Sequence, residues 1–183
     1  MKTTALFLTV LLFLILTLAI PVLGTTVPKM DLKALIGKSD HIVQGKVEAI
    51  DVVVEQKRPF TRVRIRVDDP IYARRGDRRQ TVFLKFLGGR MDTPRGPVDL
   101  AISGMPSFNV GDNVIVFLRE QPDGNNSVVG LNQGKYLVLN EVAIASITGV
   151  DLVDPKTGKI VPSGYLESAP VDAFKARIRE LLK

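Results

Sequence analysis

The spacing of apolar and polar residues along most of this chain has a period of two. The clearest example is the segment 61–67, where four apolar or β-branched residues alternate with three basic ones. The first set is Thr61, Val63, Ile65 and Val67, and the second set is Arg62, Arg64 and Arg66. This alternation predicts a β-strand with one buried face and one solvated, basic face.

Further β-rich runs follow at short intervals. They cover residues 42–54, 81–87, 98–102, 113–118, 127–131, 135–139 and 142–150. Turn signals separate them at 75–77, 88–89, 110–112 and 122–125. The glycines at 88–89 predict a flexible connection, since the pattern of a phosphate-binding loop is missing there. Many short strands and few helices predict a mainly β protein, built as a small antiparallel barrel or sandwich.

Two helices are predicted, one before the first long strand and one at the end of the chain. Residues 31–36 form the short N-terminal helix. In the last segment, Pro170 fits the first helical turn, and an apolar stripe at helical spacing follows it. The stripe consists of Val171, Phe174, Ile178, Leu181 and Leu182. We expect this C-terminal helix to pack on the barrel through that stripe.

Gly45 lies inside the long first strand, where the apolar side of the chain changes. The apolar positions shift from Val43 and Val47 to the even-numbered positions 50–54. A β-bulge or a sharp bend at Gly45, of the kind that closes small barrels, explains both the glycine and the shift.

The first 24 residues have the order of a secretory signal peptide. Lys2 precedes an unbroken apolar run, residues 5–20, which Pro21 ends shortly before Gly24. Val22 and Gly24 suit a signal peptidase site, so we expect cleavage after Gly24. The alternative is an uncleaved membrane anchor, because residues 5–23 are nearly long enough to cross a bilayer. In both cases the remainder, residues 25–183, lies outside the cytoplasm, in the periplasm or beyond the cell.

Residues 25–183 are long enough to form one domain with its own core. The chain has no cysteine, so apolar packing has to stabilise it without disulfides. Its 25 lysines and arginines outnumber its 19 aspartates and glutamates. We expect a basic exported protein to meet an acidic protein or an anionic envelope polymer. Nucleic acid is not an expected partner, and a membrane is one only if the signal is uncleaved.

The sequence has no recognisable catalytic or metal-binding constellation. His41 is the only histidine and cysteine is absent, which removes the usual zinc-ligand sets. Ser39 and Asp40 cannot both face His41 along an extended chain, and no Gly-x-Ser-x-Gly elbow is present. Asp68 and Asp69 are neighbours on a predicted strand, so their side chains point to opposite faces. We expect His41 to be a surface or half-buried residue, and we expect no enzymatic activity, metal or cofactor.

The most basic region of the chain is a turn around Gly76, which we call the basic turn. The candidate binding residues are Arg74, Arg75, Arg78 and Arg79 of this turn, together with Arg62, Arg64 and Arg66, which we call the arginine row. Guanidinium groups that converge hold carboxylates or phosphates bidentately, which lysine does less well. The alternative is a solvated turn beside a charged strand face that blocks edge pairing.

Two sets of motifs resemble known families. Residues 39–47 (SDHIVQGKV), the strand 61–67 and the turn 72–77 resemble the opening of netrin-like domains and of tissue inhibitors of metalloproteinases. That resemblance implies an OB-type barrel with a helix packed on it. Residues 104–108 (GMPSF), 111–118 (GDNVIVFL) and 129–136 (VGLNQGKY) look like a group of uncharacterised exported bacterial β-barrel proteins that share this opening. This second likeness covers most of residues 31–139 and implies a fold and an exported location, with no assigned activity.

We therefore expect an exported, non-catalytic binding or assembly module whose basic turn or barrel face meets a partner. The alternative implied by the inhibitor resemblance is inhibition of an exported metalloprotease. Those inhibitors chelate the protease zinc through the amine and carbonyl of an N-terminal cysteine. The expected first residue here is Thr25, so this chain departs from the family pattern at the residue that carries the mechanism.

Overall fold

The structure of the chain is a computed structural model. It describes residues 26–76, 78–161 and 164–183, so the predicted signal segment 1–24 lies outside the described residues. The strands are β1 (Thr26–Pro28), β2 (His41–Glu55), β3 (Arg58–Ala73), β4 (Thr81–Leu87), β5 (Gly89–Thr93), β6 (Gly96–Leu100), β7 (Asn113–Glu120), β8 (Asn126–Val128), β9 (Lys135–Leu139), β10 (Val142–Ile147), β11 (Asp151–Val153), β12 (Ile160–Val161) and β13 (Tyr165–Pro170). The helices are α2 (Leu32–Gly37) and α3 (Val171–Leu181), and a 3₁₀ turn, η1, spans Leu131–Gly134. The described chain is thus mainly β with two helices, as the alternation of apolar residues predicted.

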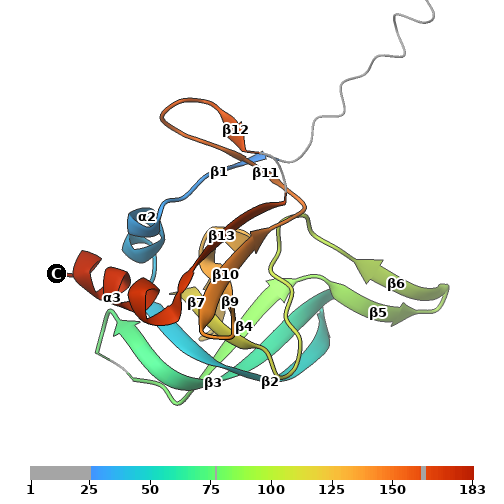
Figure 1. Cartoon of the computed structure of the whole chain (residues 1–183). Helices are drawn as coiled ribbons and strands as arrows, with labels where there is room; N and C mark the ends of the chain where they lie inside the picture. The colour runs from blue at the N-terminus through green and yellow to red at the C-terminus, as the bar shows by residue number, and fades with distance from the viewer. Residues whose placement is uncertain (1–25, 77, 162–163) are drawn as a thin grey trace, which may run out of the picture.

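Five strands pair in a closed ring. Four of them, β2, β3, β4 and β7, are labelled in Figure 1. β2 lies between β3 and β7, and β4 pairs with the other edge of β3. The short β8 closes the ring, because it pairs with β7 in antiparallel orientation and meets β4 in parallel orientation through Leu84 and Asn126. Beyond β7 the same sheet continues through β9, β10 and β13.

The apolar run of β7 separates two cores. Val114, Val116 and Leu118 pack with residues of β2, β3 and β4 in one core. Ile115 and Phe117 point the other way and pack with residues of α2 and α3. A strand buried on both faces has a continuous apolar sequence instead of an alternating one, which explains this segment. β2 and β7 therefore form the centre of the molecule, and the ends of both strands have fixed positions.

Gly45 lies at an irregularity of β2, as the apolar pattern predicted. The register of β2 against β3 shifts between Gln44 and Gly45, and again between Val47 and Ala49. A Cβ atom at Gly45 would lie 2.1 Å from the carbonyl oxygen of Arg66 on β3, so no larger residue fits without a backbone shift. These bulges let one long strand pair with β3 along its length and with β7 over its first six residues.

Helix α2 confirms the predicted N-terminal helix and leads directly to the start of β2. Asp31 caps it, because its Oδ1 accepts a hydrogen bond from the amide of Ala34 at 2.8 Å. Leu35 and Ile36 are buried against the sheet. After the helix, the hydroxyl of Ser39 donates to the carbonyl of Leu35 at 2.7 Å. This bond fixes the residues that enter the ring.

Helix α3 packs on the sheet, as its apolar stripe predicted. Phe174 is 7% exposed, and its ring centroid lies 4.4 Å from that of Tyr136 and 6.3 Å from that of Phe117. Leu181 and Leu182 at the end of the stripe are partly buried. None of the helices in the part of the chain that the structure describes is long and apolar enough to cross a bilayer.

Several strands were not predicted, namely β1, β5, β11, β12 and β13. β1 pairs in parallel with β11, and β11 pairs with β12 in a small separate sheet. β13 pairs with β10 over six residues and connects directly to α3. β1, β11 and β12 have only two or three residues each, which is too short for a periodic pattern, so their pairing depends on tertiary context.

Glycine geometry corrects three further predictions. The connection expected at residues 88–89 is part of a hairpin, because Gly89 begins β5, which pairs with β6 and extends from the ring (Figure 1). Gly89 has a φ of 119°, which only glycine adopts without strain. The strands expected at 127–131 and 142–150 end earlier, since Gly130 and Gly149 take left-handed φ values of 69° and 78°.

Candidate functional site

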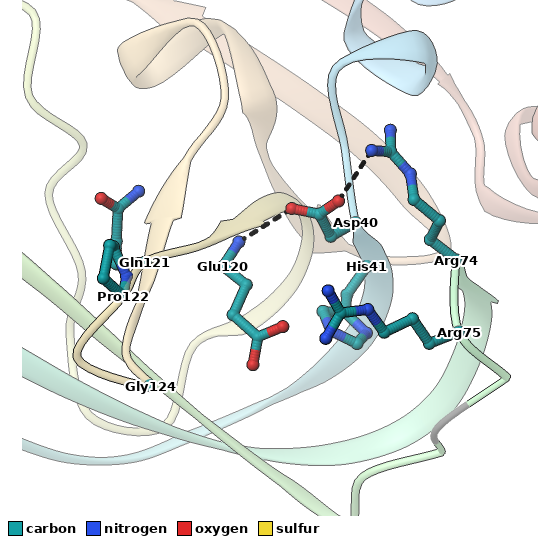
Figure 2. Close-up of a pocket in the computed structure, with 8 residues that line it drawn as sticks. All are labelled: Asp40, His41, Arg74, Arg75, Glu120, Gln121, Pro122 and Gly124. Carbon is teal, nitrogen blue, oxygen red and sulfur yellow. Dashed lines mark hydrogen bonds and ion pairs between the residues drawn. The ribbon is translucent and has the colours of Figure 1, made fainter.

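One pocket lies where β2 begins and where β3 and β7 end (Figure 2). Its volume is about 460 Å³. The residues that line it are Asp40, His41, Arg74, Arg75, Glu120, Gln121, Pro122 and Gly124. Two members of the basic turn therefore share a pocket with segments that are distant in sequence. We call it the Arg75 pocket.

Backbone pairing fixes the walls of the Arg75 pocket. The amide of Asp40 donates to the carbonyl of Leu118 at 2.7 Å, and the amide of Arg74 donates to the carbonyl of Asp40 at 2.8 Å. His41, the first residue of β2, pairs with Ala73 on one side and with Leu118 on the other. A pocket built on paired strands holds its side chains more exactly in place than one built on free loops.

His41 is 5% exposed, so the prediction of a surface or half-buried histidine was wrong. The sequence correctly placed it at the end of a strand. That strand is central, however, and has neighbours on both sides from its first residue. His41 lines the Arg75 pocket, and its charge favours the ionised form of Glu120.

Arg74 is held by the fold itself. Its Nη1 lies 3.0 Å from Oδ1 of Asp40, and its Nη2 donates to the carbonyls of Gly37 at 3.2 Å and Ser39 at 3.1 Å. The second oxygen of Asp40, Oδ2, accepts a hydrogen bond from the amide of Glu120 at 3.1 Å (Figure 2). These contacts connect the end of α2, the start of β2 and the end of β7. The guanidinium of Arg74 therefore stabilises the pocket wall.

Arg79 is bonded to Glu120 across the same end of the ring. Its Nη2 lies 2.7 Å from Oε1 of Glu120. This guanidinium lowers the pKa of the Glu120 carboxyl below its ordinary value, and the charges of His41 and Arg75 act in the same direction. Glu120 is therefore ionised at neutral pH. Together with Arg79, three guanidiniums meet two carboxylates, Asp40 and Glu120, at this end of the ring, which leaves one positive charge in excess.

Arg75 and Arg78 differ from their neighbours in the basic turn. Both side chains are exposed, and within residues 26–76, 78–161 and 164–183 neither forms an ion pair with a carboxylate. Arg75 extends toward Glu120 and His41 inside the pocket (Figure 2). Arg78 is not among the lining residues. Of the four arginines of the basic turn, Arg74 and Arg79 thus bond to carboxylates of the fold. The N–H donors of Arg75 and Arg78 are not used by any described carboxylate.

The arginine row does not join the Arg75 pocket. Arg62 Nε donates to Asp51 at 2.9 Å, and Arg64 and Arg66 share Glu48 at 3.3 Å and 3.4 Å. Carboxylates of β2 therefore neutralise much of the row. Over residues 60–66 β3 pairs with both β2 and β4, so the arginine row does not lie on a free edge that it could block from pairing.

Asp68 and Asp69 have separate partners, as their neighbouring positions on a strand predicted. Asp68 pairs with Arg66 at 3.2 Å. Asp69 pairs with Lys175 at 2.6 Å and with Arg179 at 3.2 Å, which anchors α3 to β3. In the ranges that the structure describes, no three histidine, aspartate or glutamate side chains gather in a way that could hold a metal ion.

Glu120 and the turn 121–124 are the part of the pocket that sequence reasoning missed. Arg79 and Glu120 lie 41 positions apart, and no local pattern connects them. The sequence signal for Glu120 was only that an acidic residue follows the apolar run 113–118. Acidic residues are common where a strand leaves the core, so this signal did not indicate a site.

Comparisons of the chain with models of protein families, with curated proteins and with solved structures find no match. The resemblances to exported bacterial proteins and to netrin-like domains stay predictions.

Proposed function

We propose that this protein is an exported, non-catalytic binding or assembly module, and that the Arg75 pocket receives an acidic group of its partner. The partner is a protein or an anionic polymer of the cell envelope. The observation that carries the proposal is the placement of Arg75. Arg74 and Arg79 are bonded to carboxylates of the pocket, whereas Arg75 lines it without a carboxylate partner in the described residues.

The chemistry of the pocket favours a carboxylate or a phosphate. A guanidinium is planar and presents a fork of N–H donors that matches either group bidentately. The walls are already ordered by the bonds of Asp40 and Glu120, so binding has to order little besides the side chain of Arg75. Because Arg75 is exposed, its contact with a partner is sensitive to salt.

The arrangement of strands supports an OB-like barrel. OB folds are five-stranded, partly open barrels, and this ring has five strands, with a single pair of residues between β4 and β8. In OB folds the loop between the fourth and fifth strands takes part in ligand binding. In chain order round the ring, that loop corresponds to residues 121–125, and Gln121, Pro122 and Gly124 line the Arg75 pocket.

Two parts of the proposal come from the sequence alone. The signal pattern of residues 1–24 supports export with cleavage after Gly24, and the membrane anchor is its alternative. The resemblance to metalloprotease inhibitors leaves inhibition as the alternative activity.

Retention on immobilised poly-L-glutamate across a salt series tests the binding role. A double variant, Arg75→Ala with Arg78→Ala, removes the two guanidiniums of the basic turn that form no ion pair with a described carboxylate. The matched control, Arg62→Ala with Arg64→Ala, removes the same charge from the ion-paired row. We expect the first variant to elute at clearly lower salt than the wild type, and the control to elute close to it. Equal elution of the two variants would attribute retention to net charge and contradict the proposal.

The inhibitor alternative has a separate test. Exported protein beginning at Thr25 is incubated with a secreted zinc metalloprotease, and peptide hydrolysis is followed. Binding through the Arg75 pocket predicts no inhibition. Inhibition that persists in Arg75→Ala and disappears after deletion of Thr25 and Thr26 would replace the binding role with the inhibitor role.

A further inference from the structure

β5 and β6 form a hairpin that projects from the ring as a separate two-stranded sheet (Figure 1). Its pairing runs from Gly89 with Leu100 to Thr93 with Gly96 without a register shift. Within residues 26–76, 78–161 and 164–183, neither strand pairs with a third strand. A lone two-stranded hairpin is only marginally stable in water. The outer edges of this hairpin are therefore places where a further strand would stabilise it.

Pro97 shows which backbone groups face the outer edges. Proline has no N–H, so its pair with Asp92 is of the non-hydrogen-bonded kind and the pairs on either side carry the bonds. The two kinds alternate along an antiparallel ladder, so the pair of Arg90 with Asp99 is non-hydrogen-bonded too. The N–H and C=O groups of Arg90 and Asp92 consequently point away from β6. Among the described residues, no backbone group outside β6 bonds to them.

The two outer edges of the hairpin differ in what they offer to another strand. On β6 the outward residues are Pro97 and Asp99, and Pro97 has no donor, which is typical of an edge protected against pairing. On β5 the outward residues are Arg90 and Asp92, which both have an N–H and are both exposed. Their opposite charges stand two positions apart. The edge of β5 is therefore complementary to itself when a second copy runs antiparallel to it about Met91.

We propose that β5 pairs with β5 of a second copy of this chain, antiparallel about a two-fold axis at Met91, to form a symmetric dimer. Arg90 of each copy then lies opposite Asp92 of the other, and the two pairs supply four backbone hydrogen bonds and two ion pairs. A parallel arrangement about a two-fold axis would place like charges opposite each other, which is unfavourable. The charge order along β5 thus selects the antiparallel dimer.

The same register brings the apolar side chains of the hairpin together. Met91 faces Val98 within the hairpin, and the proposed axis places Met91 opposite Met91 of the second copy. Val98 is 45% exposed, and Met91 is half-buried. In the resulting four-stranded sheet these four side chains form one apolar row on one face, and Arg90 and Asp92 lie on the other face. A sheet of four strands with an apolar row is stable where a lone hairpin is not.

The size of the contact predicts how tightly the copies bind. β5 has five residues, which is fewer than the roughly 20–30 residues a side of a standard protein interface, so we expect a weak and reversible dimer. The hairpin has no residue in common with the Arg75 pocket. This proposal and the proposed function therefore fail separately.

Single cysteine variants test the axis, because the chain has no cysteine of its own. Met91→Cys places two thiols in a non-hydrogen-bonded pair, with Cα atoms about 4.5 Å apart, which is within reach of a disulfide. The matched control is Val98→Cys, which is more exposed but would lie three strand spacings, about 14 Å, from its copy. With the same mild oxidant, we expect Met91→Cys to form disulfide dimers at least ~10-fold faster. Equal rates, or faster dimerisation of Val98→Cys, would overturn the proposal.

Sedimentation velocity over a concentration series of the exported protein tests the charges. Arg90→Asp is expected to weaken dimerisation at least ~10-fold, because carboxylates then face each other. Adding Asp92→Arg restores opposite charges in the swapped order and should bring dimerisation back to within ~3-fold of the wild type. Arg177→Asp makes the same change in net charge on the exposed face of α3 and should leave dimerisation unchanged. A wild type that stays monomeric up to about 1 mM, or a double variant no better than Arg90→Asp, contradicts the proposal.

Discussion

Arg79 donates from Nη2 to Oε1 of Glu120 at 2.7 Å, and this contact connects the turn after β3 to the end of β7. It occupies one of the two carboxylates that line the Arg75 pocket. Arg75 consequently lines the pocket beside a glutamate that already has a partner. With Glu120 paired to Arg79 and Asp40 paired to Arg74, the charge of Arg75 is the one in excess at this end of the ring.

Replacing Glu120 by glutamine is expected to destabilise the protein in a pH-dependent manner. Because its pKa is lowered from the ordinary value of 4.5 in the folded state, the ionised carboxylate contributes stability above about pH 4.5. That contribution is lost as the pH falls through the lower folded-state pKa. Urea denaturation at about pH 7 and about pH 3 should show a larger difference between wild type and Glu120→Gln at the higher pH.

The control for this experiment is Glu180→Gln, which removes a carboxylate from an exposed pair with Arg177 on α3. Such pairs contribute little, so we expect a small effect at either pH. A difference between wild type and Glu120→Gln that grows toward acid pH would contradict the assignment of the Arg79 contact.

Gly45→Ala is expected to be strongly destabilising, by about 3 kcal/mol or more, because the added Cβ meets the backbone carbonyl of Arg66 at 2.1 Å. Gly37→Ala is the matched control. A Cβ at Gly37 meets nothing within 4 Å, so its effect should stay within about 1 kcal/mol and favour the folded state. Similar urea midpoints for the two variants would show that β2 and β3 do not approach each other at Gly45 as described.

Phe174→Ala is expected to cost about 3–5 kcal/mol of unfolding free energy, since the ring is enclosed by Phe117 and Tyr136. Phe83→Ala makes the same truncation at a side chain that is 49% exposed on β4 and should cost clearly less. Urea denaturation measures both. Equal losses would indicate that α3 is not part of the core.

The parts of the fold that the sequence predicted are those in which periodicity and burial coincide. Residues 61–67 alternate because β3 has one face in the core, and the stripe of α3 repeats because one side of that helix is buried. The bulge at Gly45 was predicted for the same reason, since it shifts the apolar side of β2.

The candidate site was only partly predictable, because charge clusters in sequence do not reveal their partners. The basic turn was identified, but its division into held and unpaired arginines depends on Asp40 and Glu120, which approach it through the pairing of β2 with β3 and β7. His41 was misplaced because a strand end in sequence does not tell whether the strand is central.

Cleavage of the signal after Gly24 is a prediction from the sequence alone. Intact mass and N-terminal sequencing of the exported protein should give a chain that starts at Thr25. Gly24→Lys replaces the small residue at the expected site and should block processing. Recovery of Met1 or Lys2 on the wild-type protein in the membrane fraction would support the anchor instead.

Arginine side-chain NMR during titration with a short glutamate oligomer decides whether Arg75 receives an acidic group. We predict a saturable shift of the Arg75 Nε–H signal, together with the Gly124 amide on the facing wall, and little change at Arg62 and Arg64. The shift should weaken as salt is added, because the contact is exposed. A titration in which the arginine row moves most and Arg75 does not move would contradict the account.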